Sequence, residues 1–424
     1  MNFMHKIALC TACLLFVLAG FTIRSGSTNN KFPAKADLKL PPGFSATIIA
    51  DSLGRLRHLE VNNQGDIYVK LNALKDGKGI CVLSDMNHDG IIDKKTTFGD
   101  YPGTGIKIKN QYLYSASNSG VFRYKLDDNG KVITPDKPEV IVQGLVDKKR
   151  DNSKSIAIDD KNNLYVSVGS YSDACRETNS GKGIPACPLL DSVAGIWKFK
   201  ADKLNQSYGD AVHFARGLKN SVGIDWNSNT KSLFATQHGR GAFEDKFPQY
   251  YTAKQNVELP AETMYEVSEG SDAGWPFVYY DHIQKKKILA PEYGGDGKIV
   301  GDRKFIDPIV AFPAHLAPND LLFYTGNMFP KRYKNGAFVV FHSKSAELKK
   351  GYLVAFVPFE NGKSSGNWEI FADNFSGVDL EKSAGPLQYR PMGLAQGPDG
   401  SLYVSDDMKG AIFRITYSDK TRNN

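Results

Sequence analysis

Residues 397–407 read GPDGSLYVSDD, a turn of Pro, Asp and Gly that leads directly into a short strand-like segment. The same order, a polar turn followed by an aromatic or β-branched strand, recurs along the chain. Closer copies are NNQGDIYVKL at 62–71, KNNLYVSVG at 161–169 and SNTKSLFATQ at 228–237, and looser ones are NQYLYSAS at 110–117 and NGAFVVFHS at 335–343. Gly, Asn and Asp favour the turn conformations, and the residues after them are typical of strands.

A turn-and-strand unit repeated at a period of tens of residues predicts a β-propeller, in which four-stranded blades surround an axis. A blade of about 60 to 65 residues divides the chain into six, within a fold range of roughly four to eight blades. The 40 glycines and the 11% of aromatic residues agree with many strands joined by turns. A two-sheet sandwich is the alternative, but the recurring strand favours radial repetition. We therefore expect an all-β chain with a single six-bladed β-propeller over residues 36–418.

The composition excludes several classes of protein. With 424 residues, 41% hydrophobic and 23% charged, the chain is neither disordered, nor collagen-like, nor a polytopic membrane protein. The 53 basic residues outnumber the 46 acidic ones and give a net charge of +7, but they are scattered along the chain. We therefore expect no nucleic-acid partner, since such proteins carry a continuous basic stripe.

The first residues predict export. Lys6 precedes an apolar stretch, 7–21, that is short for a membrane span, so residues 1–25 are interpreted as a secretory signal peptide. An uncleaved N-terminal anchor is the alternative, and only then would the protein meet a membrane. A periplasmic or extracellular location favours a disulfide between Cys175 and Cys187, which bracket a loop rich in Gly and Ser. Cys81 lies among apolar residues and is predicted to be a buried strand cysteine.

A short calcium-type loop occupies residues 84–93, SDMNHDGIID. Oxygen ligands alternate along it, and the glycine suits the sharp turn that such loops require. The predicted ligands are Asp85, Asn87, Asp89 and Asp93. The loop would bind a structural Ca²⁺, and the alternative is an Asx-rich hairpin turn without metal.

Cations beside histidines recur where strands are expected to end, as at Arg57–His58 and in the segment His238–Gly239–Arg240. In a propeller the loops of one face converge on the axis, where a ring of cations would suit a polyanionic ligand. Taken singly, each of these residues is more simply interpreted as an ordinary solvated cation of the protein surface. The motifs of serine hydrolases, P-loop proteins, Rossmann enzymes and zincins are absent from the sequence.

These pieces together resemble the secreted glucose/sorbosone dehydrogenases that use pyrroloquinoline quinone (PQQ), above all the L-sorbosone and pyranose dehydrogenase branch. The resemblance covers residues 38–417 and is most specific between 258 and 329. The segments that carry it include LPPGF at 40–44, SDMNHDGIID at 84–93, ARGLKNSVGIDW at 215–226, HGRG at 238–241, GWPFVYYD at 274–281, FPAHLAPNDLLFYTGNMFP at 312–330 and RPMGLAQGPDGSLYVSDD at 390–407. The family has a six-bladed propeller, in agreement with the repeat count.

The resemblance implies that PQQ lies at the propeller centre, held by cations, with a Ca²⁺ that polarises its quinone. It further implies a sugar substrate and an external electron acceptor. The residues carried over as cofactor contacts are Arg57, Lys154, Lys219, Asn220, Arg240, Lys344 and Arg390, and those near the cofactor calcium are His238, Gly239 and Glu262. Lys219–Asn220 stands where the family usually has Arg–Asn, so the charge is kept but bidentate geometry is lost.

Two departures from the family bear on catalysis. The proton-accepting histidine is replaced by Asn152, whose neutral amide cannot hold a proton. Asp151 beside it, or His315 from another segment, is expected to substitute. The family's Gly-Ser-Trp-Asn-Arg segment after His342 is replaced by residues 343–347, in which Lys344 is the one cation.

The leading hypothesis is thus an exported PQQ- and Ca²⁺-dependent dehydrogenase that oxidises a sugar or aldose by hydride transfer. Two alternatives stay open. One is a degenerate family member that binds PQQ or carbohydrate with little turnover, as the change at Asn152 suggests. The other is a calcium-dependent propeller lactonase, which would need a metal held on the axis by Glu and Asn side chains.

Overall fold

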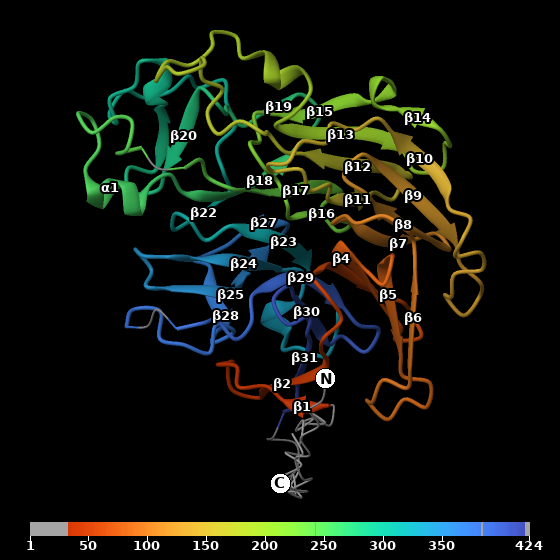
Figure 1. Ribbon diagram of the computed structural model, residues 1–424. Helices are drawn as coiled ribbons and strands as arrows, with labels where there is room; N and C mark the ends of the chain where they lie inside the picture. Colours follow the sequence, from red (N-terminus) through yellow and green to blue (C-terminus); the bar gives the residue numbers. More distant parts are fainter. Residues whose placement is uncertain (1–32, 242, 383–384, 420–424) are drawn as a thin grey trace, which may run out of the picture. The chain divides into compact units, whose positions relative to one another are not determined.

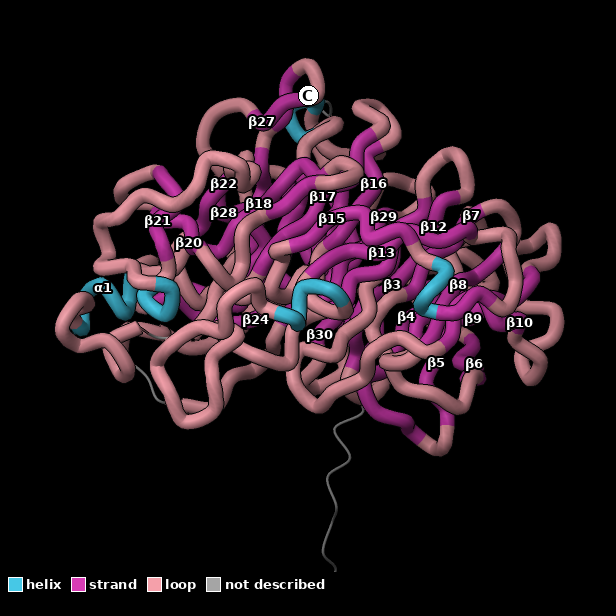
Figure 2. Tube along the Cα trace, turned by 90° about the horizontal axis from the view of Figure 1, so that it is seen from above, coloured by secondary structure: helices cyan, strands magenta, loops and turns pink. Residues whose placement is uncertain are grey.

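The computed structural model describes residues 33–241, 243–382 and 385–419. The chain divides into two units, Met1–Lys31 and Phe32–Asn424, and the predicted signal peptide, 1–25, lies outside the described residues. In the described part no helix is long and apolar enough to cross a membrane. Strands dominate the second unit, and its helices are short, as Figure 2 shows in cyan.

Six sheets in the described residues form the blades, each running from an inner strand outward as an antiparallel meander, which confirms the all-β six-bladed β-propeller (Figure 1). The limits 36–418 for a single domain stay a prediction.

Blade 1 is β3 (Leu56–Val61), β4 (Ile67–Lys75), β5 (Lys78–Ser84) and β6 (Lys94–Phe98); blade 2 is β7 (Ile106–Lys109), β8 (Tyr112–Ala116), β9 (Gly120–Lys125) and β10 (Glu139–Gln143); blade 3 is β11 (Ile156–Ile158), β12 (Asn163–Val168), β13 (Gly195–Lys200) and β15 (Val212–Arg216). Blade 4 is β16 (Ile224–Asn227), β17 (Ser232–Gln237), β18 (Glu262–Val267) and β22 (Val310–Phe312); blade 5 is β23 (Pro318–Phe323), β24 (Ala337–Ser345), β25 (Lys350–Val357) and β28 (Glu369–Ala372); blade 6 is β29 (Pro391–Gln396), β30 (Leu402–Asp406), β31 (Ile412–Tyr417) and β2 (Phe44–Ala50).

The remaining elements extend or connect the blades. The additional strands, hairpins and helices are β1 (Ala34–Lys35), β14 (Gln206–Ser207), β19 (Ser271–Asp272), β20 (Val278–Asp281), β21 (Lys286–Leu289), β26 (Phe359–Glu360), β27 (Lys363–Ser364), α1 (Ala253–Glu258) and the 3-10 turns Pro188–Asp191, Tyr208–Asp210, Pro291–Tyr293 and Lys331–Tyr333. β1, β14 and β19 lengthen blades 6, 2 and 3, whereas β20 pairs with β21 and β26 with β27.

The recurring segments of the sequence are the second strands of the six blades, β4, β8, β12, β17, β24 and β30. In four blades the turn before this strand is closed by an Asn or Asp side chain: Asn62, Asp159, Asn227 or Asp399. Its Oδ1 accepts the backbone N–H two residues later at 2.8 to 3.0 Å. This Asx turn reverses the chain within a few residues, which explains why the polar turn residues repeat with the strands.

The ring is closed by pairing between the two ends of the chain. β2 lies antiparallel to β31, with Phe44 opposite Tyr417 and Ile48 opposite Phe413. The inner strands β3, β7, β11, β16, β23 and β29 contact their neighbours all the way round; in Figure 1 they lie toward the centre, and β6, β10 and β28 lie toward the edge. Closure of this kind protects inner strand edges from other chains.

An apolar cluster fills each interface between neighbouring blades. Successive side chains of one strand point to opposite faces of its sheet and so belong to different clusters. Phe338 and Val340 of β24 pack toward blade 6, whereas Val339 and Phe341 pack toward blade 4. All four are fully buried. Complete burial of such a side chain contributes about 1.5–3 kcal/mol, so these interfaces account for much of the stability of the ring.

Carboxylates on the inner strands also tie blades together. Asp225 of blade 4 accepts a backbone N–H of blade 5 at 2.9 Å, and Asp320 of blade 5 accepts one of blade 6 at 2.8 Å. Lys107 of blade 2 lies 2.9 Å from Glu60 and 3.8 Å from Asp225 and offsets part of their charge. Burial raises the pKa of Asp225 and of Asp320, a cost that these contacts reduce only in part.

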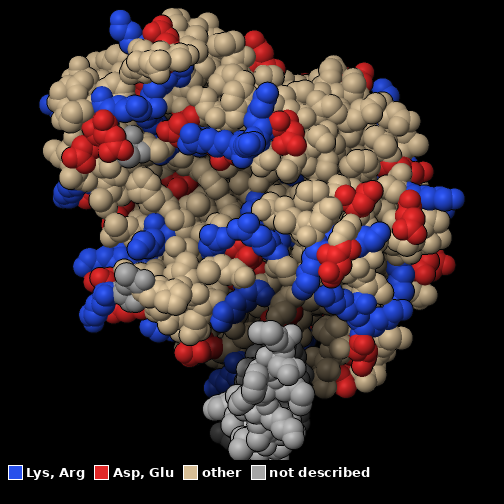
Figure 3. All heavy atoms as spheres, viewed as in Figure 1, with Lys and Arg blue, Asp and Glu red and all other residues tan. Residues whose placement is uncertain are grey.

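The cysteines are arranged as predicted. Cys175 and Cys187 form a disulfide with Cα atoms 6.1 Å apart, and Cys81 is a buried free thiol on β5. On the face drawn in Figure 3, Lys and Arg alternate with Asp and Glu.

Candidate active site

One end of the propeller axis gathers the predicted cations. Adjacent strands of a blade are antiparallel, so inner strands begin where second strands end, and we call this end of the axis the site end. Arg57 lies at the start of β3, while Lys154, Lys219 and Arg390 stand in the segments just before β11, β16 and β29. The repeat of the fold, and not proximity in sequence, brings these four residues to the same end.

Arg57 is buried and its partners are neutral. Its Nε donates to Thr104 Oγ1 at 3.1 Å and its Nη2 donates to Ser153 Oγ at 2.7 Å, which joins blades 1, 2 and 3. Burial lowers the pKa of Arg57 to about 10, and Asp407 opposes this shift from a distance. Within the described residues Arg57 forms no salt bridge, so its charge lacks a direct counter-ion.

Lys154 is fully buried beside it. Its Nζ donates to the backbone oxygen of Asn152 at 2.7 Å, and no carboxylate of the described residues forms a salt bridge with it. Burial lowers the pKa of Lys154 to about 8. Arg57 and Lys154 are therefore two desolvated cations that an anion would stabilise.

Lys219, by contrast, is neutralised by carboxylates. Its Nζ lies 2.9 Å from Asp151 Oδ2 and 3.7 Å from Asp173 Oδ1. Asp151 adopts a left-handed backbone conformation with φ +46°, and Arg150 lies 4.0 Å from the same carboxylate. Asp151 thus lies at the site end as the partner of a lysine, and its predicted catalytic role stays a prediction.

Asn220 and His238 meet across neighbouring segments of blade 4. Asn220 Nδ2 lies 3.3 Å from His238 Nδ1, and His238 Nε2 lies 3.1 Å from the backbone oxygen of Pro318. Both ring nitrogens of His238 are engaged, and burial lowers its pKa to about 4. A Cβ on Gly169 would come within 2.6 Å of Asn220 Oδ1, so the chain passes here at a distance that only glycine permits.

Arg240 belongs to a buried Arg–Glu–Arg cluster. Its Nη1 forms an ion pair with Glu292, whose other oxygen accepts Arg176 Nε at 2.8 Å. The guanidinium of Arg240 lies 4.5 Å over the ring of Phe243. Its Nη2 is buried without a hydrogen-bond partner in the described residues, and such an orphaned donor is costly unless a ligand accepts it.

Arg390 forms a fork with Asp407, at 2.7 Å from Nε to Oδ1 and 2.9 Å from Nη2 to Oδ2. Asp407 Oδ2 also lies 3.0 Å from His342 Nε2. Burial disfavours the negative charge of Asp407, but the hydrogen bonds from His342 and Arg390 outweigh this and lower its pKa to about 2. Asp407 is therefore ionised and accepts hydrogen bonds from both Arg390 and His342.

Glu262 is the buried carboxylate near His238. Its two oxygens accept the backbone amides of Gly239 at 2.8 Å and of Ala317 at 3.3 Å, and burial raises its pKa to about 7. Among the described residues no group of three or more His, Cys, Asp or Glu side chains is placed to hold a metal ion. The predicted calcium set of His238, Gly239 and Glu262 thus stays a prediction.

The calcium-type loop lies elsewhere, between β5 and β6, the two outer strands of blade 1. Asp85 Oδ2 accepts the backbone N–H of Gly90 at 2.7 Å, and Asp93 Oδ2 accepts that of Met86 at 2.7 Å. Asn87 and Asp89 accept backbone N–H groups of the same loop. These are the contacts of an Asx-rich turn, and the metal-binding role of the loop likewise stays a prediction.

Of three further predicted site residues, two have partners elsewhere and one is exposed. The side chain of Asn152 donates to Asp147 Oδ1 at 3.0 Å, and His315 Nε2 lies 2.9 Å from the backbone oxygen of Asn256. Lys344 is exposed on β24. Among the described residues, none of these three side chains forms a hydrogen bond or ion pair with Arg57, Lys154 or Arg390; the backbone oxygen of Asn152, however, accepts Lys154 Nζ at 2.7 Å. The catalytic and cofactor-binding roles of the three residues stay predictions.

Sequence reasoning missed several groups at the site end, among them His342, Asp407, Glu292 and Ser153. Asp407 ends the DD pair of the repeated segment at 397–407, and His342 is the last residue but one of the segment at 335–343. Both residues lie near the end of a recurring segment, and this common position could have marked each of them as a candidate site residue.

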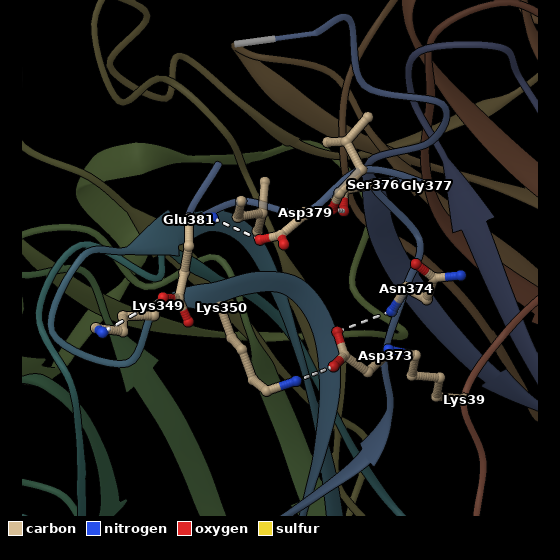
Figure 4. A pocket seen from close by; sticks show the side chains of 11 residues that line it. Lys39, Lys349, Lys350, Asp373, Asn374, Ser376, Gly377, Asp379 and Glu381 are labelled. Atoms are coloured by element: carbon tan, nitrogen blue, oxygen red, sulfur yellow. Dashed lines mark hydrogen bonds and ion pairs between the residues drawn. The ribbon is translucent and has the colours of Figure 1, made fainter. Parts of the chain in front are cut away.

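A separate groove is lined by charged residues between blades 5 and 6 (Figure 4). Four of its charged side chains pair with one another, Lys350 with Asp373 and Lys349 with Glu381, the latter at 3.3 Å, whereas Lys39 is exposed. It therefore offers no uncompensated charge comparable to that of Arg57 and Lys154.

Comparison with known proteins agrees with this architecture. A family model described as TrAA12-like matches residues 38–278 and 296–418. A pyrroloquinoline quinone-dependent sugar dehydrogenase of Hypocrea jecorina is 20% identical over 439 residues, 97% of this chain and 96% of that protein.

Two solved structures share the fold. The calcium structure of a Trichoderma reesei protein of Carbohydrate-Active Enzymes Family AA12 gives a TM-score of 0.73 at 18% identity, covering 92% of this chain and 100% of that one. The holo form of the pyranose dehydrogenase PQQ domain from Coprinopsis cinerea gives 0.69 at 19% identity, covering 89% and 97%. The resemblance drawn from the sequence is thereby confirmed, and because the family model spans most of the propeller, this chain belongs to the TrAA12-like family.

Proposed function

We propose that this protein is an exported quinoprotein dehydrogenase that oxidises a sugar or aldose, sorbosone- or pyranose-like, by hydride transfer to PQQ and then passes the electrons to an external acceptor. The observation that carries the proposal is the pair of desolvated cations, Arg57 and Lys154, which lack a direct counter-ion. A relative and a solved neighbour that use PQQ point the same way.

The residues of the site end fit a polycarboxylate cofactor. Arg57 and Lys154 would supply uncompensated charge, and Arg240 Nη2 would supply a free donor. Lys219 and Arg390 already face carboxylates, so they would add hydrogen bonds more than net charge. When bound, PQQ would supply a quinone that accepts two electrons as a hydride, chemistry that no side chain offers.

Because Arg57 and Lys154 are buried, their hydrogen bonds to PQQ would contribute more binding free energy than hydrogen bonds at the surface. A hydrogen bond to a charged group contributes about 1.5–3 kcal/mol, against about 1 kcal/mol for a neutral pair. Removing either Arg57 or Lys154 is thus expected to weaken PQQ binding by about 10- to 100-fold, at about 1.4 kcal/mol per factor of ten.

Calcium is proposed on the resemblance alone, and no step of the reaction is assigned to it. The two oxygens of Glu262 already accept backbone amides, and the described residues provide no three-ligand group. Calcium therefore enters the experiment as a separate addition.

A degenerate member that binds PQQ without turnover is the second candidate. Asn152 stands where the family carries its base, and its amide is tied to Asp147. The distinction between the two candidates is whether another group at the site end accepts the proton.

The test uses the purified apoprotein. PQQ is titrated with and without Ca²⁺ while its absorbance is followed, and reduction of a redox dye is then measured with a panel of aldoses. Arg57→Gln and Lys154→Met are the test variants, and Lys161→Met, an exposed lysine of the same blade as Lys154, is the matched control.

Each outcome selects one reading. A spectral change that is lost in the two test variants and kept in the control, together with dye reduction, supports the proposal, whereas no change on titration overturns it. Binding without dye reduction selects the degenerate reading, and hydrolysis of sugar lactones without PQQ selects a lactonase. Export is tested separately, by the N-terminal sequence of the protein recovered outside the cytoplasm.

A further inference from the structure

We propose that His342 is the general base that accepts the hydroxyl proton of the substrate, and that Asp407 is its positioning residue. This inference rests on the proposed function, since it names the group that completes that reaction. It starts from a contact between two second strands: His342 lies near the end of β24, Asp407 directly follows β30, and His342 Nε2 lies 3.0 Å from Asp407 Oδ2.

The hydrogen bond fixes which nitrogen carries the proton. Asp407 also accepts both donors of Arg390, so it is an ionised acceptor and His342 Nε2 must be the donor. Neutral imidazole then presents an unprotonated Nδ1. In the described part of the chain Nδ1 has no hydrogen-bond partner and is not sealed from solvent, because it is absent from the buried unpaired atoms. A carboxylate that holds one nitrogen so that the other can accept a proton is the arrangement of a general base with its orienting group.

The surroundings keep this imidazole neutral. Burial, together with the charges of Arg390 and Arg57, lowers the pKa of His342, and Asp407 opposes that shift. His342 belongs to the site end because it shares the carboxylate of Asp407 with Arg390. The base form is therefore the resting form near neutral pH, as proton abstraction requires.

The other candidates at this end have partners of their own but lack the His–Asp hydrogen bond of His342; His315 Nε2, for one, lies 2.9 Å from the backbone oxygen of Asn256. Both ring nitrogens of His238 have partners, and the carboxylate of Asp151 is ion-paired with Lys219. His58 is buried, and its Nε2 lies 2.8 Å from the backbone oxygen of Asn319. Asn152 cannot hold a proton at all.

The proposed step balances as follows. The O–H bond of the sugar breaks and its proton passes to His342 Nδ1, while the electron pair stays on oxygen and forms the C=O bond. The C–H bond at the same carbon breaks, and its two electrons leave as hydride to the bound quinone. The imidazolium, held by Asp407, then returns its proton to solvent, and the product is a lactone or the corresponding acid after hydrolysis.

His342→Gln and Asp407→Asn test the inference, with His282→Gln as the matched control. His282 also pairs with a carboxylate, Glu347 at 2.9 Å, but it lies beside the β20–β21 hairpin and has no place in the proposed site. We expect His342→Gln to lower kcat by about 10²- to 10⁴-fold with PQQ affinity unchanged within about threefold. The control variant is expected to keep wild-type kcat.

A second readout needs no cofactor. Nitrogen-15 NMR of histidine-labelled apoprotein reports which ring nitrogen is protonated and at what pH. We expect His342 to carry its proton on Nε2, and Asp407→Asn to move its titration to lower pH, because the carboxylate stabilises the imidazolium. In the loaded enzyme the acid limb of the kcat profile is expected to move in the same direction.

The outcomes separate this inference from the proposed function. If the wild-type protein oxidises sugars and His342→Gln keeps kcat within about threefold, the base is another group and only the inference fails. A parallel loss of PQQ affinity would make His342 a cofactor contact and also overturns it. If no sugar is oxidised, the proposed function fails, and a proton found on Nδ1 of His342 in the apoprotein would independently refute the geometry argued above.

Discussion

Lys154→Met is expected to stabilise the apoprotein while it weakens the cofactor site. Lys154 is fully buried, and burial lowers its pKa from 10.5 to about 8. At about 1.4 kcal/mol per pH unit, the charged form costs about 3 kcal/mol in the folded state. Methionine has a similar length and no charge. It loses the hydrogen bond to Asn152, worth about 1 kcal/mol, so the net gain is about 2 kcal/mol near pH 7.

The pH dependence has a definite sign. Because the folded pKa lies below the unfolded one, the unfolded chain binds more protons between about pH 8 and 10.5. The stability of the wild-type protein therefore recovers as the pH rises through this window, and the advantage of Lys154→Met disappears near its upper end.

The assay is urea unfolding followed by tryptophan fluorescence at about pH 7 and about pH 10.5, without PQQ. Lys161→Met, an exposed lysine on the same blade, is the control and is expected to change the free energy of unfolding by less than about 0.5 kcal/mol. A Lys154→Met protein that is less stable near pH 7, or equally favoured at both pH values, would refute the view of Lys154 as an uncompensated buried charge.

Three further perturbations test other parts of the structure. Cys175→Ser with Cys187→Ser removes a crosslink with a sequence separation of 12 and is expected to cost about 3 kcal/mol of unfolding free energy, measured by urea unfolding against the oxidised wild type. Glu292→Gln leaves the buried Arg240 and the half-buried Arg176 without their shared carboxylate and is expected to cost about 3–5 kcal/mol, seen as a lower unfolding midpoint; no change would mean that solvent reaches the cluster. Asn152→His is expected to leave the rate of sugar oxidation within about threefold, since this side chain is directed to Asp147; a large increase would restore position 152 as the missing base.

The fold was predictable because its signal is local and repeated. Each Asx turn and the strand after it stand within about ten residues of sequence, so the six second strands could be recognised one by one. The cations Arg57, Lys154 and Arg390 could be proposed from the resemblance to a known family, and the structure places each where an inner strand begins.

The pairing of side chains between blades could not be predicted. His342 and Asp407 are 65 residues apart, and Arg240 and Glu292 are 52 apart, with no sequence feature that links either pair. The directions in which the side chains of Asp151 and Asn152 point could not be predicted from the sequence either. Asp151 has φ +46°, a conformation rare for residues other than glycine, and the adjacent Asn152 contacts Asp147 while Asp151 contacts Lys219.

The structure also explains how the site can differ from its family while the propeller stays intact. The inner strands are fixed by interblade packing and by Asp225 and Asp320, which accept backbone amides of the next blade. The side chain of Asn152 contacts Asp147 and takes no part in these contacts, so a different residue at position 152 leaves them in place. A base supplied by His342 comes instead from a second strand, with its carboxylate partner on the neighbouring blade. The orientation of the His342 imidazole then depends on the packing of blades 5 and 6. Phe338→Ala would loosen that interface and is expected to reduce kcat as well as stability. A loss of stability with kcat unchanged would argue against a coupling between blade packing and catalysis.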